Sequence, residues 1–205
     1  MSKILHIVAS PRGARSASRA VAEKFLEARL AARPGATVET LDLWQANLPE
    51  FDGPALEGKY AILHGQPHTP EQARAWAAVT ALADQLKAAD QYVFSLPMWN
   101  FGIPYKLKQW IDIVVQPGLT FSYSPETGYT GLVTGKKALA VYARGGAYGP
   151  GTGAEGYDAQ SAYLKQVLGF IGVTDVQDFF VEPTLGGPEA LAAATQKAGA
   201  LAAAF

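Results

Sequence analysis

The chain has 205 residues and a formal net charge of −1, with 49% hydrophobic and 17% charged residues. This length and balance fit one globular domain over residues 1–205, and the weak charge argues against nucleic acid or an anionic membrane as partner. The sequence has no cysteine, which excludes disulfides, thiolate metal sites and cysteine redox couples. Its apolar runs are too short for a signal peptide or a membrane span, so we expect a cytoplasmic protein.

The pattern of apolar residues predicts alternating strands and helices. In chain order we expect a strand at 4–9, a helix at 21–32, a strand at 37–41, a long connection without clear periodicity at 45–69, a helix at 76–86, a strand at 92–96, a helix at 107–114, a strand at 137–143, a helix at 164–171, a strand at 176–181 and a last helix opening at 187–189. The strands are almost continuously apolar, as expected of parallel strands buried on both faces.

This alternation predicts a doubly wound α/β sandwich, with a parallel sheet covered by helices on both faces, because right-handed crossovers place the helices there. In such folds the ligand binds beyond the carboxyl ends of the strands, where the strand order reverses. The informative residues should therefore follow the first, third and fourth strands.

The loop after the first strand is rich in hydroxyl groups and leads into a helix. It contains Ser10, Ser16 and Ser18 with Arg12 and Arg15. Backbone N–H groups at a helix start attract an anion, and serine hydroxyls can donate to it, so the loop predicts a phosphate site. The alternative is an ordinary serine N-cap beside solvated arginines. The loop lacks G-x-G-x-x-G, and residues 131–137 do not form a P-loop, because their glycines are too close together and a strand succeeds them instead of a helix.

The loop after the third strand, residues 97–104, mixes large flat side chains with one amide and is bounded by prolines. Trp99 and Phe101 offer apolar surface, and the Asn100 amide could meet the polar edge of a ring. This composition favours a site for a planar heteroaromatic group. The alternative is that both aromatic residues are core residues on a tight turn.

The loop after the fourth strand begins with Arg144-Gly145-Gly146 and stays rich in glycine up to residue 151. Glycine has no Cβ, so the backbone here can approach a ligand closely and offer its amides to a ring edge. The alternative is a flexible surface loop.

With these loops in order, the chain resembles the FMN-dependent NADH azoreductases, also described as NADH:quinone oxidoreductases of flavodoxin-like fold. The stretches that carry the resemblance are PMWNFGIPYKLKQWID, GLTFSYSPETGYTGLVTGKKALAV, ARGG and LGFIGVTDV. The resemblance spans nearly the whole chain and implies a five-stranded parallel sheet in the order 2-1-3-4-5. It also implies a homodimer with the active site at the subunit interface.

The resemblance further implies the site residues. The first loop would hold the FMN phosphate, residues 98–101 would line the flavin ring, and residues 143–146 would close its pyrimidine side. The candidate cofactor-binding residues are Ser10, Arg12, Ser16, Ala17, Ser18, Pro97, Met98, Trp99, Asn100, Phe101, Ala143, Arg144, Gly145 and Gly146. Two of them depart from the pattern of many relatives, which carry Ser at position 143 and Tyr at position 99. Ala143 forgoes a side-chain hydrogen bond worth about 0.5 to 1.5 kcal/mol, and Trp99 changes the shape of the pocket.

We therefore expect NADH or NADPH to give a hydride to flavin N5 and leave, after which a quinone or azo compound takes its place in a ping-pong mechanism. No side chain is assigned as catalytic, and no metal site is expected, because the three histidines do not follow a zinc pattern. The candidate walls of the acceptor pocket are Phe121, Tyr123, Tyr129 and Tyr148, although such aromatic residues are as often packing residues.

Two alternatives remain. An electron-transfer flavodoxin would benefit from a strongly charged docking face, which 17 basic and 18 acidic residues do not supply as a net field. A hydrolase is less favoured, because the sequence has no G-x-S-x-G elbow to accompany its histidines. The choice between NADH and NADPH and the natural acceptor stay open.

Overall fold

The computed structural model describes residues 2–149 and 151–205. In chain order its elements are β1 (Lys3–Val8), η1 (Gly13–Arg15), α1 (Ala17–Ala32), β2 (Thr37–Asp42), α2 (Gly53–Leu63), α3 (Pro70–Ala88), β3 (Gln91–Pro97), α4 (Tyr105–Val114), β4 (Phe121–Ser124), β5 (Gly128–Gly131), β6 (Lys137–Ala143), η2 (Glu155–Tyr157), α5 (Ala159–Ile171), β7 (Asp175–Val181), η3 (Thr184–Gly186) and α6 (Glu189–Ala204). Each predicted strand overlaps one of these strands, and each predicted helix overlaps one of these helices.

Five strands form one parallel sheet in the order β2-β1-β3-β6-β7. The doubly wound α/β class is confirmed. The predicted order 2-1-3-4-5 assumed that the chain has five strands, whereas β4 and β5 form an additional antiparallel hairpin outside this sheet. The last two places in the sheet are therefore taken by the sixth and seventh strands of the chain.

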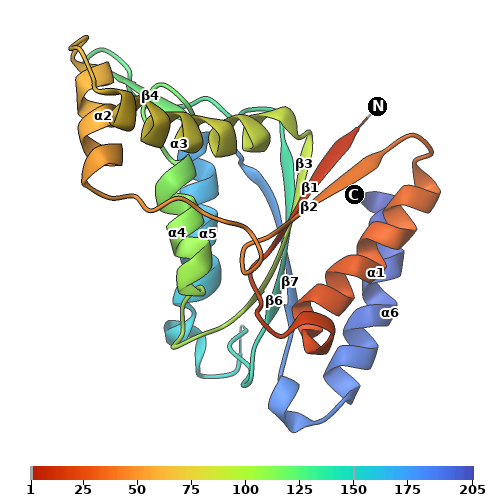
Figure 1. Cartoon of the computed structure of the whole chain (residues 1–205). Coiled ribbons are helices and arrows are strands. Elements are labelled where there is room, and N and C mark those ends of the chain that lie inside the picture. Colours follow the sequence, from red (N-terminus) through yellow and green to blue (C-terminus); the bar gives the residue numbers. More distant parts are fainter. Residues whose placement is uncertain (1, 150) are drawn as a thin grey trace.

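The helices cover both faces of the sheet, with α1 and α6 on one side and α3, α4 and α5 on the other (Figure 1). The central strands β1, β3 and β6 are buried along almost their whole length, whereas the edge strands β2 and β7 are mostly half-buried or exposed. Burial on both faces explains why the central strands read as continuous apolar runs.

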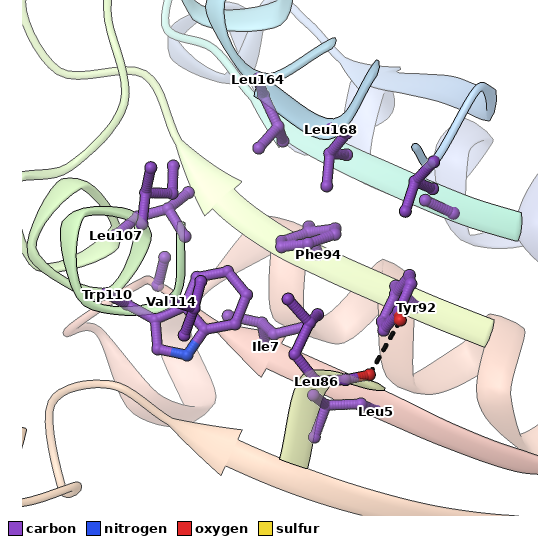
Figure 2. Packing of buried hydrophobic residues seen from close by; sticks show 14 of the residues in the cluster. Leu5, Ile7, Leu86, Tyr92, Phe94, Leu107, Trp110, Val114, Leu164 and Leu168 are labelled. Atoms are coloured by element: carbon purple, nitrogen blue, oxygen red, sulfur yellow. Dashed lines mark hydrogen bonds between the residues drawn. The ribbon is translucent and has the colours of Figure 1, made fainter. Parts of the chain in front are cut away.

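The larger core lies between the sheet and α3, α4 and α5 (Figure 2). Phe94 on β3 packs there beside Trp110 of α4, with ring centroids 6.1 Å apart. Tyr92 fills the same layer, and its hydroxyl donates a hydrogen bond of 2.8 Å to the carbonyl of Leu86. A buried tyrosine hydroxyl needs such a partner, and this one fixes the end of α3 to the sheet.

Helix α2 lies within the connection for which no periodicity was predicted. Only Ala55 and Gly58 are buried in it, so it has no apolar stripe for sequence analysis to detect. A Cβ at Gly58 would lie 2.9 Å from the carbonyl oxygen of Gln72, so glycine allows α2 to pack closely on α3. None of the helices in the described ranges is long and apolar enough to cross a membrane.

Candidate functional site

The loops after β1, β3 and β6 lie at one edge of the sheet. These strands are neighbours and run parallel, so their carboxyl ends meet there. Backbone hydrogen bonds of 2.9 Å join Ala9 to Ser95 and Met98 to Ala143 across this edge. Because neighbouring strands are about 4.8 Å apart, the three loops begin within about 10 Å of one another.

The first loop leads into the N-cap and the first turn of α1. Ser16 is the N-cap residue, and its hydroxyl accepts from the Arg19 amide at 3.3 Å and lies 3.3 Å from the Ser18 hydroxyl. The amides of Ala17 and Ser18 have no acceptor in the part of the chain that the structure describes, as expected for the first turn of a helix. Ser10, Ser16 and Ser18 are buried, while Arg12 is exposed. The serine N-cap is therefore present, and free donors for an anion lie beside it.

The second loop is a tight turn with strained backbone. Trp99 and Gly102 exchange two backbone hydrogen bonds of 3.0 Å, and the residues between them, Asn100 and Phe101, have φ values of 47° and 68°. Such turns normally take glycine at the second of these positions, and left-handed backbone in another residue costs of order 1 to 3 kcal/mol. Strain of this kind concentrates at functional sites.

The aromatic residues of this loop are not core residues. Trp99 is 37% and Phe101 46% exposed. Trp99 lies beside Trp44 and Tyr105, with ring centroids 5.8 and 6.1 Å away. The indole Nε1 of Trp44 donates to the Ala9 carbonyl at 3.0 Å, which fixes this aromatic group to the end of β1. The alternative of a tight turn made of core residues is therefore wrong.

Two further aromatic residues contact Phe101 from the loop after β6. Tyr157 stacks on it at 5.0 Å and 29°, and Tyr148 meets it edge to face at 6.2 Å. Tyr157 and Trp44 were missed in the sequence. Their positions offered a signal, because Trp44 follows β2 at the same edge and Tyr157 lies six residues beyond the glycine-rich stretch that ends at residue 151.

The third loop begins with an arginine whose side chain is turned into the protein. The Arg144 side chain is fully buried, so it does not face the open edge, and its guanidinium donates to Asp158 at 2.7 Å and to Gln160 at 3.1 Å. It also lies over the Phe180 ring, 4.1 Å from the centroid. The guanidinium is thus used within the protein. The backbone amide of Arg144 donates to Val181 at 3.0 Å and its carbonyl accepts from Thr184 at 2.8 Å, so the free donors of this loop belong to the glycines that follow.

The amides of Gly145 and Gly146 are free for such contacts. Neither has a hydrogen-bond acceptor within residues 2–149 and 151–205. A Cβ at Gly145 would lie 3.0 Å from Leu185, and one at Gly146 would lie 3.3 Å from the Tyr148 hydroxyl. Both positions therefore fit glycine closely.

The structure does not bring the four predicted walls of the acceptor pocket together within one chain. Tyr148 lies at the carboxyl edge, but Phe121, Tyr123 and Tyr129 are on the β4–β5 hairpin at the opposite edge, near α2 at the top of Figure 1. The reason is the direction of α4. Its 10 residues run back from the carboxyl edge for about 15 Å before the hairpin begins.

The hairpin is fixed at that opposite edge by the end of α5. The Phe121 ring lies 4.7 Å from the ring of Phe170, and Val133 donates a backbone hydrogen bond of 2.8 Å to Ile171. The sequence placed these rings near the site because it does not specify at which edge a short hairpin packs.

The histidines do not form a hydrolytic site. Burial lowers the pKa of His6 to about 4, with a smaller contribution from Arg19, and its Nε2 lies 3.0 Å from the Ser95 hydroxyl inside the sheet. His6 is therefore neutral near pH 7 and enclosed. His64 and His68 are exposed beside α2 and α3, away from the three loops.

Comparison with known proteins identifies relatives of the whole chain. Residues 2–204 match a family described as having a flavodoxin-like fold. The chain is 54% identical over 190 residues to an FMN-dependent NADH:quinone oxidoreductase of Nitratidesulfovibrio vulgaris strain DP4, covering 92% of this chain and 90% of the relative. It is 44% identical over 200 residues to FMN-dependent NADH:quinone oxidoreductase 3 of Pseudomonas fluorescens, covering 97% and 93%. An FMN-dependent NADH-azoreductase of Bacillus anthracis solved in complex with FMN has a TM-score of 0.91 and 30% identity, covering 100% and 99%.

Proposed function

Because this chain belongs to the FMN-dependent NADH:quinone oxidoreductase family of flavodoxin-like fold, we propose that it binds one FMN at the carboxyl edge of its sheet. FMN held there would supply, through its N5, the hydride chemistry that links NADH or NADPH to a quinone or azo compound in a ping-pong cycle. The observation that supports this most strongly is the set of backbone amides on three neighbouring loops that have no acceptor among the described residues.

The donors fit the two ends of FMN. The start of α1, with the free amides of Ala17 and Ser18 and the Ser16 hydroxyl, suits a phosphate. The Asn100 amide and the amides of Gly145 and Gly146 suit the carbonyl and imide edge of a flat ring. Ser10, Arg12, Pro97, Met98, Trp99, Phe101 and Ala143 complete the proposed site. Arg144 lies behind it, because its amide and carbonyl are already paired with Val181 and Thr184.

The chain's own task in the reaction is to bind and orient. NADH gives up two electrons and one proton as a hydride, and a quinone needs that hydride and one further proton to become a hydroquinone. Bulk water can supply this proton, so we assign no acid or base to the chain. Holding the nicotinamide and the acceptor in turn against one ring face supplies the orientation, with Tyr148 and Tyr157 beside that place.

One preparation tests the proposal. The purified protein should be yellow, with absorption near ~450 nm that bleaches when NADH is added without oxygen, because that chemistry is the cofactor's. It should oxidise NADH steadily with a simple benzoquinone or with an azo dye and no protein partner. A flavodoxin would bleach with a chemical reductant but leave NADH unused. A colourless protein that stays inactive with added FMN would overturn the proposal.

We also propose that the active site lies at a homodimer interface. A groove of about 740 Å³ runs beside α4 and α5, from Tyr105 at the start of α4 to Phe170 near the end of α5. Tyr123 and Tyr129 on the neighbouring hairpin are 62% and 66% exposed. Contiguous exposed rings favour a protein interface.

A two-fold axis across this groove would exchange its two ends. The partner subunit's hairpin would then reach the carboxyl edge of this chain. Such an arrangement restores Phe121, Tyr123 and Tyr129 as walls of the acceptor pocket, supplied by the second copy. A cytoplasmic location stays a prediction.

Mixed dimers test this arrangement. Ser16→Asp keeps a good N-cap but puts a negative charge in the phosphate cradle, and a Tyr123→Ala/Tyr129→Ala variant removes the hairpin rings. Each variant alone should be inactive. When both are coexpressed, half of the dimers are mixed and carry one complete site, which restores about a quarter of the wild-type activity. No recovery in verified mixed dimers, or a monomer by sedimentation, would contradict the proposal.

A further inference from the structure

A buried ion network lies directly behind the loop after β6. The Arg144 guanidinium meets Asp158 at 2.7 Å and Gln160 at 3.1 Å at the start of α5, and Glu182 at 3.4 Å after β7. Glu182 also accepts a hydrogen bond of 3.2 Å from the Tyr148 amide. One fully buried side chain therefore joins three segments, and its partner Glu182 holds the far end of the same loop.

One guanidinium meets two acidic side chains, Asp158 and Glu182, in this network. Burial works to raise the pKa of Asp158, but hydrogen bonds from Ser161 and from Arg144 outweigh it and hold that pKa below its ordinary value. Asp158 is thus a carboxylate facing a guanidinium at neutral pH. Removing one partner from a buried ion pair leaves a charge without compensation, which protein structures avoid by rearranging.

The backbone of the loop is held from one side only. The Arg144 carbonyl accepts from the Thr184 amide at 2.8 Å and from the Thr184 hydroxyl at 2.9 Å. The Gly145 carbonyl accepts from the Leu185 amide at 3.2 Å. Both carbonyls therefore face the segment that follows β7.

This arrangement sets the direction of the free amides. In a planar trans peptide the N–H points opposite to the C=O, so the amides of Gly145 and Gly146 point away from the segment after β7. Since β6 lies between β7 and β3 in the sheet, that direction is toward the loop after β3. We therefore infer that the amides point toward the loop that contains Asn100 and Phe101.

We propose that Arg144 is a positioning residue that, with Thr184, fixes the peptide planes of 144–146 so that the Gly145 and Gly146 amides point at the pyrimidine edge of a bound flavin. The inference rests on the proposed function. Negative charge gathers on that edge when the ring is reduced, and donors fixed in advance stabilise it without having to reorganise. Arg144 thereby tunes the affinity for the ring and its redox potential without touching it.

Arginine suits this position better than lysine. Its planar group presents five donors in a fixed fork, whereas lysine has a compact ammonium on a flexible stem. Lysine can keep one carboxylate contact but cannot span Asp158, Gln160 and Glu182 together.

The mildest test is Thr184→Val, which removes the hydroxyl that donates to the Arg144 carbonyl and leaves every charge in place. Its control is Thr195→Val on α6, which removes a hydroxyl donating to the Leu191 carbonyl at 2.8 Å. Both variants lose one hydrogen bond to a carbonyl. We expect Thr184→Val to raise the dissociation constant of FMN about two- to tenfold and to lower the midpoint potential, while Thr195→Val changes neither.

Riboflavin, which has the ring but no phosphate, makes the test specific. Thr184→Val should raise the dissociation constants of riboflavin and FMN by the same factor, because the loop is proposed to contact the ring and not the phosphate. Arg144→Met should lower both affinities more than tenfold and also lower the midpoint potential. Arg144→Lys should show smaller decreases in both affinities and in the midpoint potential. If Arg144→Met does not fold, Thr184→Val and Arg144→Lys still test whether Arg144 and Thr184 position the loop.

The failures are distinguishable. If the wild-type chain binds neither FMN nor riboflavin, the proposed function fails. If the wild-type chain binds FMN, and Thr184→Val and Arg144→Lys keep its affinity and potential while only their melting temperatures fall, Arg144 and Thr184 are merely structural and the inference is overturned.

Discussion

The two ends of the sheet expose different kinds of group. At the carboxyl edge, backbone amides such as those of Ala17 and Gly145 have no internal acceptor among the described residues. At the opposite edge, called here the amino edge because the parallel strands begin there, the hairpin pairs its own backbone and exposes the rings of Tyr123 and Tyr129. Unpaired donors are satisfied by water or a polar ligand, whereas exposed rings are covered best by protein. One end is therefore suited to a small anionic ligand and the other to a second protein surface.

The largest effect should come from crowding the amino edge. A Cβ at Gly131 would lie 2.3 Å from the Gly172 nitrogen and 2.4 Å from the Ile171 carbonyl carbon, both backbone atoms that cannot move aside. We expect Gly131→Ala to lower the free energy of unfolding by about 3 kcal/mol through overpacking and to weaken dimerisation. Urea denaturation and sedimentation measure the two effects.

The control for this change is Gly169→Ala, in α5, where an added Cβ meets no atom within 4 Å. Alanine favours a helix, so this variant should be at least as stable as the wild type. Equal stability of Gly131→Ala and Gly169→Ala would show that the hairpin is not packed against α5 as described.

The next largest effect concerns the pH dependence of stability, which His6 inside the sheet should produce. Burial lowers the pKa of His6 to about 4, while the unfolded chain holds an ordinary histidine, so protons bind the unfolded state first as the pH falls. The free energy of unfolding should therefore keep its full value above about pH 6.5 and decrease as the pH falls toward 4. The total decrease due to His6 should be about 3 kcal/mol. Urea denaturation across this range measures it.

His6→Gln removes the titrating ring and keeps a polar group near Ser95, so its stability should vary less with pH. His64→Gln, which removes an exposed histidine, should keep the wild-type dependence. A wild-type profile that is flat between pH 6.5 and pH 4 would contradict the buried neutral state of His6.

A smaller effect distinguishes a helix cap from a phosphate site. Ser16→Ala and Thr69→Ala each remove an N-cap hydroxyl, from α1 and α3 respectively, and each should cost about 1 kcal/mol of stability. Only Ser16→Ala should also weaken FMN binding, because α1 starts at the carboxyl edge and α3 does not, and it should leave riboflavin binding unchanged. Flavin fluorescence titration checks this; equal FMN affinity in both variants would place the phosphate elsewhere.

The smallest effect is expected at Asn100, where one substitution should raise the stability of the chain and weaken flavin binding. Asn100 has a φ of 47°, which glycine adopts without strain, so Asn100→Gly should stabilise the flavin-free chain by about 0.5 to 1 kcal/mol. It should nevertheless weaken flavin binding, because the amide is lost. Asn100→Ala loses the same amide and keeps the strain, so it should bind as weakly and be less stable than Asn100→Gly in thermal denaturation. Tighter flavin binding by either variant would refute a role for the amide.

Much of the fold could be predicted because the central strands are buried on both faces. A segment such as β3 has to be apolar throughout, which is visible in any short window of sequence. Helix α2 and the β4–β5 hairpin bury few residues and lack such a pattern. Their existence depends on packing against α3 and α5, which are distant or later in the chain, so local patterns did not reveal them.

The candidate site was predicted in part for the same reason. Ser16, Asn100 and Gly145 directly follow neighbouring strands, so a correct strand pattern places them at one edge. The role of Arg144 could not be predicted, because its partners Asp158 and Glu182 are 14 and 38 residues away in the chain. Whether an arginine faces a ligand or an internal carboxylate is decided by such distant contacts.

By itself, the sequence determined the alternation of strands and helices, the edge at which polar loops gather and the family to which the chain is similar. Those features can be recognised from short runs of residues, because strand burial and turn formation impose local sequence patterns. The tertiary structure alone decided that Arg144 faces inward, that Trp44 joins Trp99, and that the hairpin rings lie at the far edge. These depend on helix direction and on ion pairs between distant segments, which exist only once the chain has folded.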